Sequence, residues 1–274
     1  MRILVVGSSG MLGYVTYRYL KAKGHQVSGI TRTKFFSDMT RLDATEEPAI
    51  RRFLEETAFD AVINCAALLL KPSEAQKCEA VKLNAWLPHL LDAYCAQNNA
   101  YLIQVSTDAV FSGRRGGYRE DEPSDADTFY GKSKLLGEVC SGHALTVRSG
   151  FWGMDVNSDG AGLLQWFLRQ SGSVSGYTHA LFNGVSNLEF ARFADAALQN
   201  RWTGLYHLCA AESVSKYAFL CHAKRVFSRE TEVVQFDNPP IDRTLYCTRA
   251  DVAYQQKPFV QMLEELNEWW AHSI

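Results

Sequence analysis

The chain has 274 residues, 47% of them hydrophobic, and a formal net charge of −2 at pH 7. Its length allows one large α/β unit or a cofactor domain with a small lobe. The balanced charge argues against a nucleic-acid partner, and the longest apolar stretch, 61–70, is too short to span a bilayer. The first strand pattern begins at residue 2, which leaves no room for a signal peptide. The seven cysteines show neither a C-x-x-C pair nor zinc spacing, so we expect reduced thiols in the cytoplasm and no metal site.

Short apolar runs recur along the first half of the chain at the spacing of strand–helix units. Strands are expected at 3–6, 26–30, 61–64, 101–105 and 144–148, with a short one ending at residue 43. Helical patterns lie between them, at 11–22, 46–55, 74–97 and 128–141. This alternation predicts an α/β fold with a doubly wound parallel sheet of the Rossmann type. Ligands of such a sheet bind at the carboxyl ends of the strands.

After residue 148 the alternation ends, and the sequence predicts a smaller, discontinuous C-terminal lobe. A glycine-rich loop at 150–162 opens this part, and a strand is expected at 205–209. Further helical patterns lie near 163–170, 188–199 and 215–227, and the last helix has an apolar face of the core-packing type. We predict a dinucleotide-binding domain at 1–149, to which 182–208 returns. The substrate-binding lobe is predicted from 150–181 and 209–274.

The first expected strand leads directly into a glycine-rich turn with the spacing G-x-x-G-x-x-G. Such a turn lets the backbone approach a pyrophosphate, which then meets the free N–H groups at the start of the next helix. The alternative is a strand-to-helix turn without function, but the strand before it and the helix after it favour dinucleotide binding. The contact candidates in this turn are Gly7, Ser9, Gly10, Met11, Leu12 and Gly13.

The end of the second strand predicts which nicotinamide cofactor is bound. An NAD site usually offers a carboxylate there, for the ribose 2′-OH. This chain instead has Thr31-Arg32-Thr33-Lys34, in which Arg32 can pair with a 2′-phosphate and Thr31 or Thr33 can add a hydroxyl. We therefore expect NADP(H) in preference to NAD(H), the alternative being a solvated turn.

Two further strand ends offer cofactor contacts. Asp43 follows the short third strand and can accept a hydrogen bond from the adenine amino group. After the fourth strand, the small side chains of Cys65, Ala66 and Ala67 let a dinucleotide lie close to the backbone.

A Tyr-x-x-x-Lys pair, Tyr130 and Lys134, follows the fifth strand. On a helix the two side chains share a face, and a nearby ammonium is expected to lower the phenol pKa toward the range of a general acid. The spacing alone carries little weight, because Tyr17 and Lys21 repeat it. That second pair lies well inside the first helix, so we interpret it as a coincidence.

Ser106-Thr107-Asp108 stands at the carboxyl end of the fifth strand. A hydroxyl at this edge can bind the substrate oxygen and align it with Tyr130, although a capping role is the alternative. Together with the Tyr/Lys pair, this position favours Thr107 as a catalytic residue and Ser106 as a cofactor contact.

These segments resemble the extended short-chain dehydrogenase/reductase family, and within it the dTDP-4-dehydrorhamnose reductase branch. The resemblance is carried by 7–13, 64–67, 106–113 and 130–138, with a fainter likeness at 206–208. It implies that Thr107, Tyr130 and Lys134 form the catalytic trio and that a keto group on a nucleotide-linked sugar is reduced. The sequence departs from the branch at Ala109, Ser112, Phe151 and 177–184, where Tyr, Asp, Trp and an Asp-Gln-x-Gly-x-Pro-Thr stretch are usual.

The resulting interpretation is an NADPH-dependent reductase with a nucleotide-sugar substrate. In it Tyr130 protonates the carbonyl oxygen, Thr107 orients it, and Lys134 tunes Tyr130 and holds the nicotinamide ribose. Asp108, Phe151, Trp152 or Trp166, and Arg243 are candidate substrate contacts, the aromatic ones for the base and Arg243 for the diphosphate, although packing or a surface position is the alternative for each.

Two other functions and one assembly remain open. An NAD-dependent epimerase or dehydratase can use the same trio, and a regulatory subunit resembling the methionine adenosyltransferase β-subunit can bind NADP as a structural ligand. The apolar helix pattern at 74–97 has more than one hydrophobic face, from which we expect a homodimer by analogy with the family.

Overall fold

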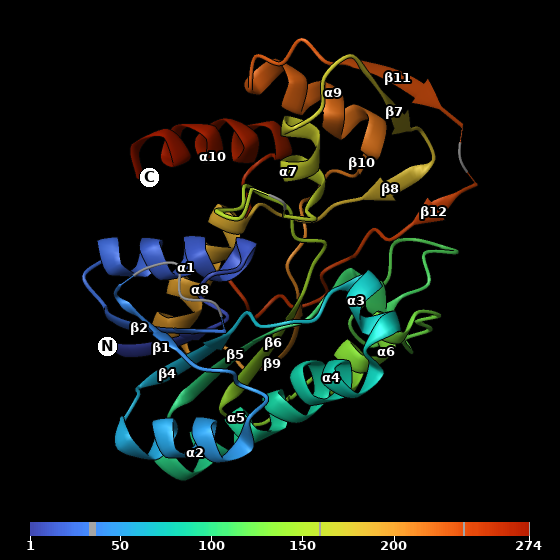
Figure 1. The fold of residues 1–274 in the computed structure, drawn as a ribbon. Coiled ribbons are helices and arrows are strands. Elements are labelled where there is room, and N and C mark those ends of the chain that lie inside the picture. Colours follow the sequence, from blue (N-terminus) through green and yellow to red (C-terminus); the bar gives the residue numbers. More distant parts are fainter. Residues whose placement is uncertain (33–36, 159, 238, 274) are drawn as a thin grey trace.

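A computed structural model describes residues 1–32, 37–158, 160–237 and 239–273, and a seven-stranded parallel sheet forms its centre (Figure 1). The strand order is β3-β2-β1-β4-β5-β6-β9, and each neighbouring pair is parallel. The bounds are β1 Arg2–Val6, β2 Gln26–Thr31, β3 Met39–Arg41, β4 Ala61–Asn64, β5 Tyr101–Val105, β6 Ala144–Arg148 and β9 Gly204–His207. The predicted Rossmann-type sheet is confirmed, with its order reversing between β1 and β4.

Helices cover both faces of this sheet. On one face lie α1 (Met11–Ala22) and α8 (Asn187–Asn200), and on the other lie α2 (Glu47–Glu56) and α5 (Leu87–Asn98) (Figure 1). The side chains of β1 alternate between two cores: Ile3 and Val5 pack on the α1 side, whereas Leu4 and Val6 pack on the α2 side. Because both faces are buried, β1 carries apolar side chains at four consecutive positions, Ile3–Val6.

The helix predicted at 74–97 forms without a break from Lys77 to Asn98 but contains a π-bulge, and three helical segments precede α5. They are α3 (Leu70–Ala75), α4 (Lys77–Val81) and the π-helical segment η1 (Lys82–Trp86). Within the π segment, buried Asn84 bonds to the backbone N–H and carbonyl of Leu68, at 2.8 and 2.9 Å, and to the Ser133 hydroxyl at 3.0 Å. This tertiary contact explains the π-bulge. The homodimer expected from the helix stays a prediction.

Two other boundaries differ from the prediction. The helix expected at 128–141 is α6, which spans only Phe129–Leu136 and has Gly137 as its C-cap. A Cβ at Gly137 would lie 1.9 Å from the Asn84 carbonyl oxygen, so the chain must pass there without a side chain. The third strand ends at Arg41 instead of Asp43, because the Asp43 carboxylate turns back to Thr45, accepting from its N–H at 2.9 Å and its hydroxyl at 2.7 Å.

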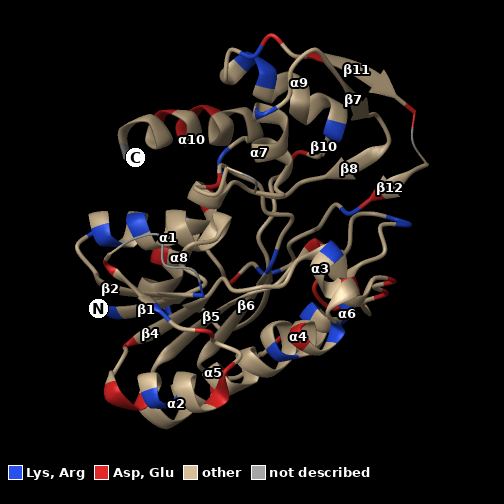
Figure 2. Cartoon of the chain, in the orientation of Figure 1, with Lys and Arg blue, Asp and Glu red and all other residues tan. Residues whose placement is uncertain are grey.

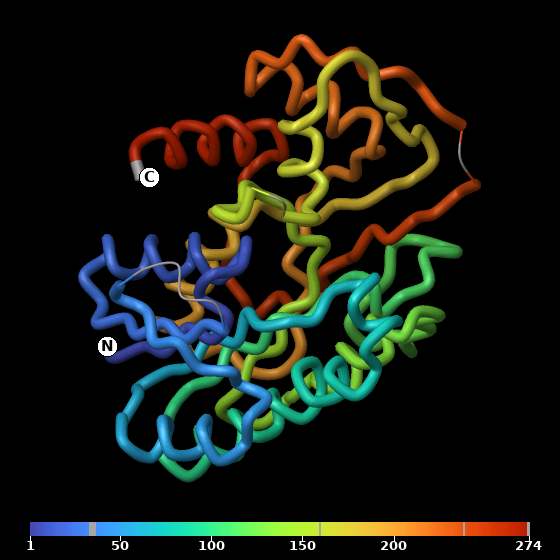
Figure 3. The backbone as a smooth tube through the Cα atoms, viewed as in Figure 1, coloured from blue at the N-terminus to red at the C-terminus, as the bar shows by residue number. Residues whose placement is uncertain are grey.

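The C-terminal lobe lies above the carboxyl ends of the large sheet and contains two small sheets. One has the order β10-β8-β12 and the other pairs β7 with β11 in parallel. The elements of the lobe are α7 (Leu163–Leu168), β7 (Ser173–Tyr177), β8 (Ala180–Phe182), β10 (Val214–Ser215), α9 (Lys216–Val226), β11 (Glu232–Phe236), β12 (Ile241–Asp242) and α10 (Phe259–Ser273). The backbone trace crosses between the two parts more than once (Figure 3), because α8 and β9 return to the Rossmann part. The exact limits of the two domains stay a prediction.

Basic and acidic residues are mixed along both parts of the described chain (Figure 2). None of the described helices is long and apolar enough to cross a membrane.

Candidate active site

A cavity of about 710 Å³ lies between the carboxyl ends of the sheet and the C-terminal lobe. Its walls combine residues from both parts of the chain. The predicted site residues that line it are Gly10, Met11, Leu12, Cys65, Ala67, Ser106, Thr107, Asp108, Tyr130, Lys134, Phe151, Trp152 and Arg243. The structure therefore brings the predicted catalytic trio together with part of the glycine turn. Among the described residues, no group of three or more His, Cys, Asp or Glu side chains could hold a metal ion.

At two of its three glycines, the turn between β1 and α1 leaves no room for a side chain. Gly7 has a φ of 76°, and a Cβ there would lie 2.9 Å from the backbone of Ala66. A Cβ on Gly13 would lie 2.2 Å from the Gly7 carbonyl oxygen. Gly10 is different, since its nearest neighbour would be 3.4 Å away. The chain itself therefore does not require glycine at position 10.

The start of α1 is open to an anionic ligand. Gly10 is its N-cap, and within the described chain no side chain caps the first N–H groups. The first turn also contains no acidic residue. Unpaired N–H groups and the positive end of the helix dipole form a phosphate site. The residues present therefore fit the pyrophosphate of a dinucleotide, with Gly10, Met11 and Leu12 facing the cavity.

The predicted adenosine contacts lie beside the glycine turn and outside the lining of the cavity. Thr31 is buried at the end of β2, and its hydroxyl bonds to that of Ser9. Arg32 follows and is exposed, where a 2′-phosphate could reach it. Thr33 and Lys34 lie outside the described residues. One oxygen of the Asp43 carboxylate accepts both hydrogen bonds from Thr45, so Asp43 stabilises the turn after β3.

The end of β4 supplies the small side chains that were predicted. Buried Asn64 donates to Gln104 on β5 at 2.9 Å and accepts from the Ala66 N–H at 3.2 Å, which fixes the turn. Burial raises the pKa of Cys65 to about 12, so the thiol stays neutral. Cys65 and Ala67 then offer an uncharged wall to the cavity.

The Tyr130/Lys134 pair differs from its prediction in one respect. We expected Lys134 to lower the pKa of Tyr130, but burial raises that pKa to about 12, an increase that a hydrogen bond with the Thr107 side chain opposes. Lys134 is only 2% exposed, and its Nζ donates to the Val105 carbonyl at 2.6 Å. Burial lowers its pKa to about 8. At pH 7 the site therefore contains a protonated phenol and a largely charged ammonium.

Thr107 has the capping role that the sequence gave as the alternative, and its part in catalysis stays a prediction. It is the N-cap of the short 3-10 helix Asp108–Val110 and accepts from the Ala109 N–H at 3.1 Å. Its hydroxyl also donates to the Asp108 carboxylate at 3.1 Å and contacts Tyr130. Burial raises the pKa of Asp108, and the charges of Arg243 and Lys216 oppose that increase.

Ser106 belongs to a buried polar network that also contains Glu138 and Arg148. Its hydroxyl donates to Glu138 at 2.6 Å while the residue lines the cavity, and its contact with the cofactor stays a prediction. Glu138 also accepts two hydrogen bonds from Arg148, each of 2.7 Å, and both side chains are less than 9% exposed. The ion pair ties the ends of β5 and β6 to the residues that follow α6. The sequence placed Ser106 and Glu138 in resembling segments but gave no sign of their contact.

The predicted aromatic contacts lie mostly in the core. Trp152 is 2% exposed, its indole N–H donates to the Gly184 carbonyl at 3.1 Å, and it packs on Phe219 and Phe259. The predicted role in stacking on a base is therefore wrong for Trp152. Phe151 is half-buried and meets Phe190 edge-on, while Trp166 packs against the same core.

Arg243 reaches the cavity from the segment after β12, and Lys216 reaches it from the start of α9. The Arg243 Nε is buried and has no hydrogen-bond partner among the described residues. Burial lowers the pKa of Lys216, which the positive charge of Arg243 lowers further and Asp108 raises. Lys216 was not predicted from the sequence, because an isolated lysine outside a motif carries no signal.

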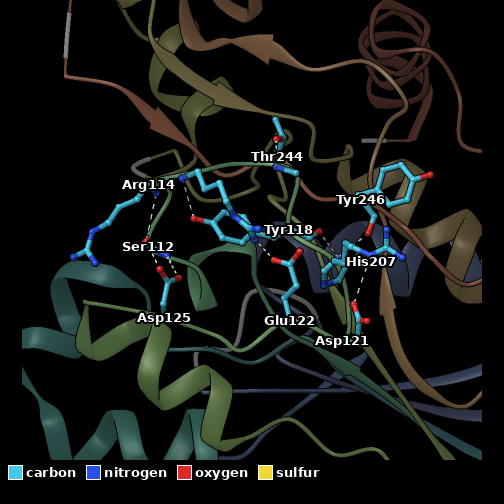
Figure 4. Close-up of polar contacts among 12 residues, drawn as sticks. Ser112, Arg114, Tyr118, Asp121, Glu122, Asp125, His207, Thr244 and Tyr246 are labelled. Atoms are coloured by element: carbon cyan, nitrogen blue, oxygen red, sulfur yellow. Dashed lines mark hydrogen bonds and ion pairs between the residues drawn. The ribbon is translucent and has the colours of Figure 1, made fainter.

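The segment that carries Arg243 is clamped to the loop after β5 (Figure 4). Tyr118 exchanges backbone hydrogen bonds with it, donating to the Thr244 carbonyl at 3.0 Å and accepting from the Tyr246 N–H at 2.7 Å. The His207 Nδ1 lies 3.2 Å from the carbonyl oxygens of both Tyr118 and Tyr246, so this nitrogen carries the proton and donates. Burial lowers the His207 pKa, which keeps the ring neutral. Arg243 therefore projects from a fixed backbone.

Residues 1–147 match the family model described as the RmlD substrate binding domain. A dTDP-4-dehydrorhamnose reductase of Mycolicibacterium smegmatis is 37% identical over 140 residues, which cover 50% of this chain and 40% of the relative. The probable low-salt glycan biosynthesis reductase Agl14 of Haloferax volcanii is 34% identical over 182 residues, 61% of this chain and 59% of the relative. The matches thus span about half the length of these relatives.

A third relative extends further along the chain. Methionine adenosyltransferase 2 subunit beta of Danio rerio is 26% identical over 241 residues, 83% of this chain and 74% of the relative.

Solved structures match over almost the whole chain. A hypothetical dTDP-4-dehydrorhamnose reductase from Sulfolobus tokodaii has a TM-score of 0.82 at 25% identity and covers 94% of this chain and 96% of its own. The dTDP-4-dehydrorhamnose reductase of Bacillus anthracis in complex with NADP has a TM-score of 0.85 at 19% identity and covers 97% and 98%. The expected resemblance is confirmed, and the fold of the C-terminal lobe is shared as well.

Proposed function

The chain belongs to the RmlD substrate-binding domain family, and on this premise we propose that it is an NADPH-dependent reductase of a keto group on a nucleotide-linked sugar. One observation carries the proposal: Thr107, Tyr130 and Lys134 line a single cavity beside the open start of α1. The candidate general acid, Tyr130, and the candidate pyrophosphate site at the start of α1 would then lie beside each other in the cavity.

The trio has the protonation states that a carbonyl reduction requires. When bound, NADPH supplies a hydride for the carbonyl carbon. The Tyr130 phenol, held neutral by a pKa of about 12, donates its proton to the carbonyl oxygen as a general acid. The Thr107 hydroxyl, fixed by its cap to Ala109, holds that oxygen in place. The hydrogen bond with the Thr107 side chain favours the phenolate that Tyr130 leaves behind.

Cofactor binding is assigned to the strand ends and the glycine turn. The N–H groups of Met11 and Leu12 would bind the pyrophosphate of NADPH, and Lys134 would bind its nicotinamide ribose. Arg32 pairs with the 2′-phosphate and so favours NADP(H) over NAD(H). The relative crystallised with NADP has the same fold, which supports this choice of cofactor.

On the substrate side, Arg243 and Lys216 hold the diphosphate of a nucleotide sugar. Both are cations, both line the cavity, and the unpartnered Arg243 Nε supplies a buried donor that an anion would satisfy. Polysaccharide biosynthesis is the setting in which such a reductase acts.

A regulatory role is the second candidate, because the methionine adenosyltransferase β-subunit relative matches 83% of the chain. The two functions are separated by incubating the purified chain with NADPH and dTDP-4-dehydrorhamnose, or 4-keto sugars carried by UDP and GDP. Reductase activity predicts that NADPH is consumed with at least one of these and that Tyr130→Phe abolishes the consumption. NADPH that binds but is not oxidised with any of them would contradict the reductase and favour the regulatory subunit.

A further inference from the structure

Large apolar side chains are exposed where the cavity opens in the C-terminal lobe. Tyr177 is 42% exposed, Phe236 49% and Ile241 44%, and all three line the cavity that contains the catalytic trio. Exposed apolar groups of this size gain free energy when a ligand covers them. Their grouping at a cavity therefore indicates a contact surface for an apolar or aromatic part of the ligand.

The strand pair β7–β11 explains why two of these rings stand together. Tyr177 is the last residue of β7 and Phe236 the last residue of β11, and the two are register partners in a parallel pair. Parallel strands present their carboxyl ends at one edge, and Figure 1 shows the pair at the outer edge of the lobe. The ring centroids lie 5.5 Å apart at 41°. The two strands thus present a double aromatic surface to the cavity.

Charged groups connect this aromatic surface to the catalytic residues. The Lys216 ammonium lies 5.9 Å from the centroid of the Tyr177 ring and interacts electrostatically with Arg243 and Asp108. Asp108 in turn accepts from the Thr107 hydroxyl at 3.1 Å. Along the cavity the order is therefore an aromatic pair, two cations, and then the hydroxyl groups of the reaction centre.

A nucleotide sugar has the same order of chemistry: an aromatic base, a diphosphate and a sugar. We propose that Tyr177 and Phe236 stack on the base while Lys216 and Arg243 hold the diphosphate, so that the base is a recognised part of the substrate. This inference rests on the proposed function and adds the residues that recognise the nucleotide. Stacking on aromatic side chains tolerates any base, which means that the pair selects nucleotide-linked over free or merely phosphorylated sugars.

Binding of nucleoside diphosphates to the whole chain tests the proposal. Titration calorimetry is performed with dTDP, UDP, GDP and ADP, and with inorganic diphosphate as the ligand without a base, at saturating NADP⁺ so that the cofactor site is filled. At least one nucleoside diphosphate should bind 5-fold or more tightly than inorganic diphosphate. Tyr177→Ala and Phe236→Ala should each weaken that nucleotide by roughly 5- to 150-fold and leave inorganic diphosphate unchanged.

Two control variants guard against a general loss of structure. Tyr177→Phe keeps the ring and should keep the affinity. Tyr246→Ala removes an aromatic that is 58% exposed and outside the described lining of the cavity, and it should change nothing. Equal binding of nucleotide and inorganic diphosphate, or alanine variants with unchanged nucleotide affinity, would overturn the proposal.

The base site and the reductase can fail separately. If a keto-sugar nucleotide is reduced and neither alanine variant raises its KM, the reductase stands and the base site is wrong. If the aromatic pair binds nucleoside diphosphates but no keto sugar consumes NADPH, the base site stands and the reductase is wrong.

Discussion

Two Tyr-x-x-x-Lys pairs occupy opposite surroundings in this molecule, and the one whose side chains touch is not the one in the cavity. In α1, the Lys21 Nζ lies 3.2 Å from the Tyr17 hydroxyl and 2.7 Å from the Asp38 carboxylate, with the lysine side chain 43% exposed. This cluster ties α1 to the residues before β3.

In α6 the lysine has a different neighbour and much less water. Lys134 is 2% exposed and donates to the Val105 carbonyl, while Tyr130 lines the cavity next to Thr107. Equal spacing and even direct contact therefore do not place a Tyr/Lys pair in the cavity. Position at the carboxyl ends of the parallel strands is what separates the two pairs.

Replacing Tyr130 and Tyr17 by Phe, one at a time, tests whether only the tyrosine in the cavity acts as the acid. Tyr130→Phe should lower kcat by about 10²–10⁴, the range expected for a lost general acid, with cofactor affinity kept within a few-fold. Tyr17→Phe, the matched variant in α1, should leave kcat nearly unchanged. Steady-state kinetics of both variants check this, and equal losses would mean that the acid has been misassigned.

The two lysines should give stability a pH dependence of opposite sign. The pKa of Lys134 falls from 10.5 to about 8 in the folded chain, so between these pH values only the unfolded chain holds the proton, and stability rises with pH. The free energy of unfolding of the wild type, minus that of Lys134→Met, should therefore increase by about 3 kcal/mol from pH 8 to 10.5.

Lys21 provides the control for that measurement. Its hydrogen bond with Asp38 raises its pKa, so its contribution is present at lower pH and is lost as pH rises through the folded value. Urea denaturation of both methionine variants across this pH range gives the two slopes. A flat difference for Lys134→Met would show that the ammonium is not desolvated as described.

Arg32 follows the carboxyl end of β2, and this position predicts that it contacts the cofactor. A charge-assisted contact with a 2′-phosphate contributes about 1.5–3 kcal/mol, or roughly 10- to 150-fold in affinity. Arg32→Asp should weaken NADPH by at least about tenfold while NADH binds as before or more tightly. Fluorescence titration of both cofactors against both proteins measures the preference. An unchanged preference in the variant would reduce Arg32 to a solvated turn residue.

The glycine turn offers the smallest but most local test. An added methyl at Gly13 would meet the Gly7 carbonyl at 2.2 Å, whereas at Gly10 the nearest atom is 3.4 Å away. Gly13→Ala should therefore lower the free energy of unfolding by about 1–3 kcal/mol. Gly10→Ala should fold normally and yet bind NADPH more weakly, because its methyl occupies the ligand side of the turn. If Gly10→Ala binds NADPH like the wild type, the pyrophosphate does not lie there.

The sheet was predictable because its strands are buried on both faces. The bounds of β4, β5 and β6 match the predicted ones, since each strand is mostly apolar and buried at every position. The π segment at 82–86 was not predictable, because it depends on Asn84 meeting Leu68 and Ser133 from distant segments. Helix periodicity contains no information about such contacts.

Part of the candidate site was likewise predictable from the local sequence, and part was not. The glycine turn and the catalytic trio stand on local motifs at strand ends and were visible in the sequence. Lys216, Tyr177 and Phe236 reach the cavity from three separate segments of the lobe, with no motif between them. The resemblance points to Trp152 because it adjoins Phe151, where the branch usually has a Trp, whereas the fold packs it against Phe219 of α9 and Phe259 of α10.

Isotope transfer tests the central claim most directly. The chain is incubated with NADPH deuterated on the transferred position and the keto-sugar nucleotide that consumes it, and the product is analysed by mass spectrometry and NMR. The account predicts one deuterium on the new carbinol carbon for each NADPH oxidised, with both lost in Tyr130→Phe and kept in Tyr17→Phe. Conversion of a nucleotide sugar without deuterium in the product and without net oxidation of NADPH would contradict it and identify an epimerase or dehydratase instead.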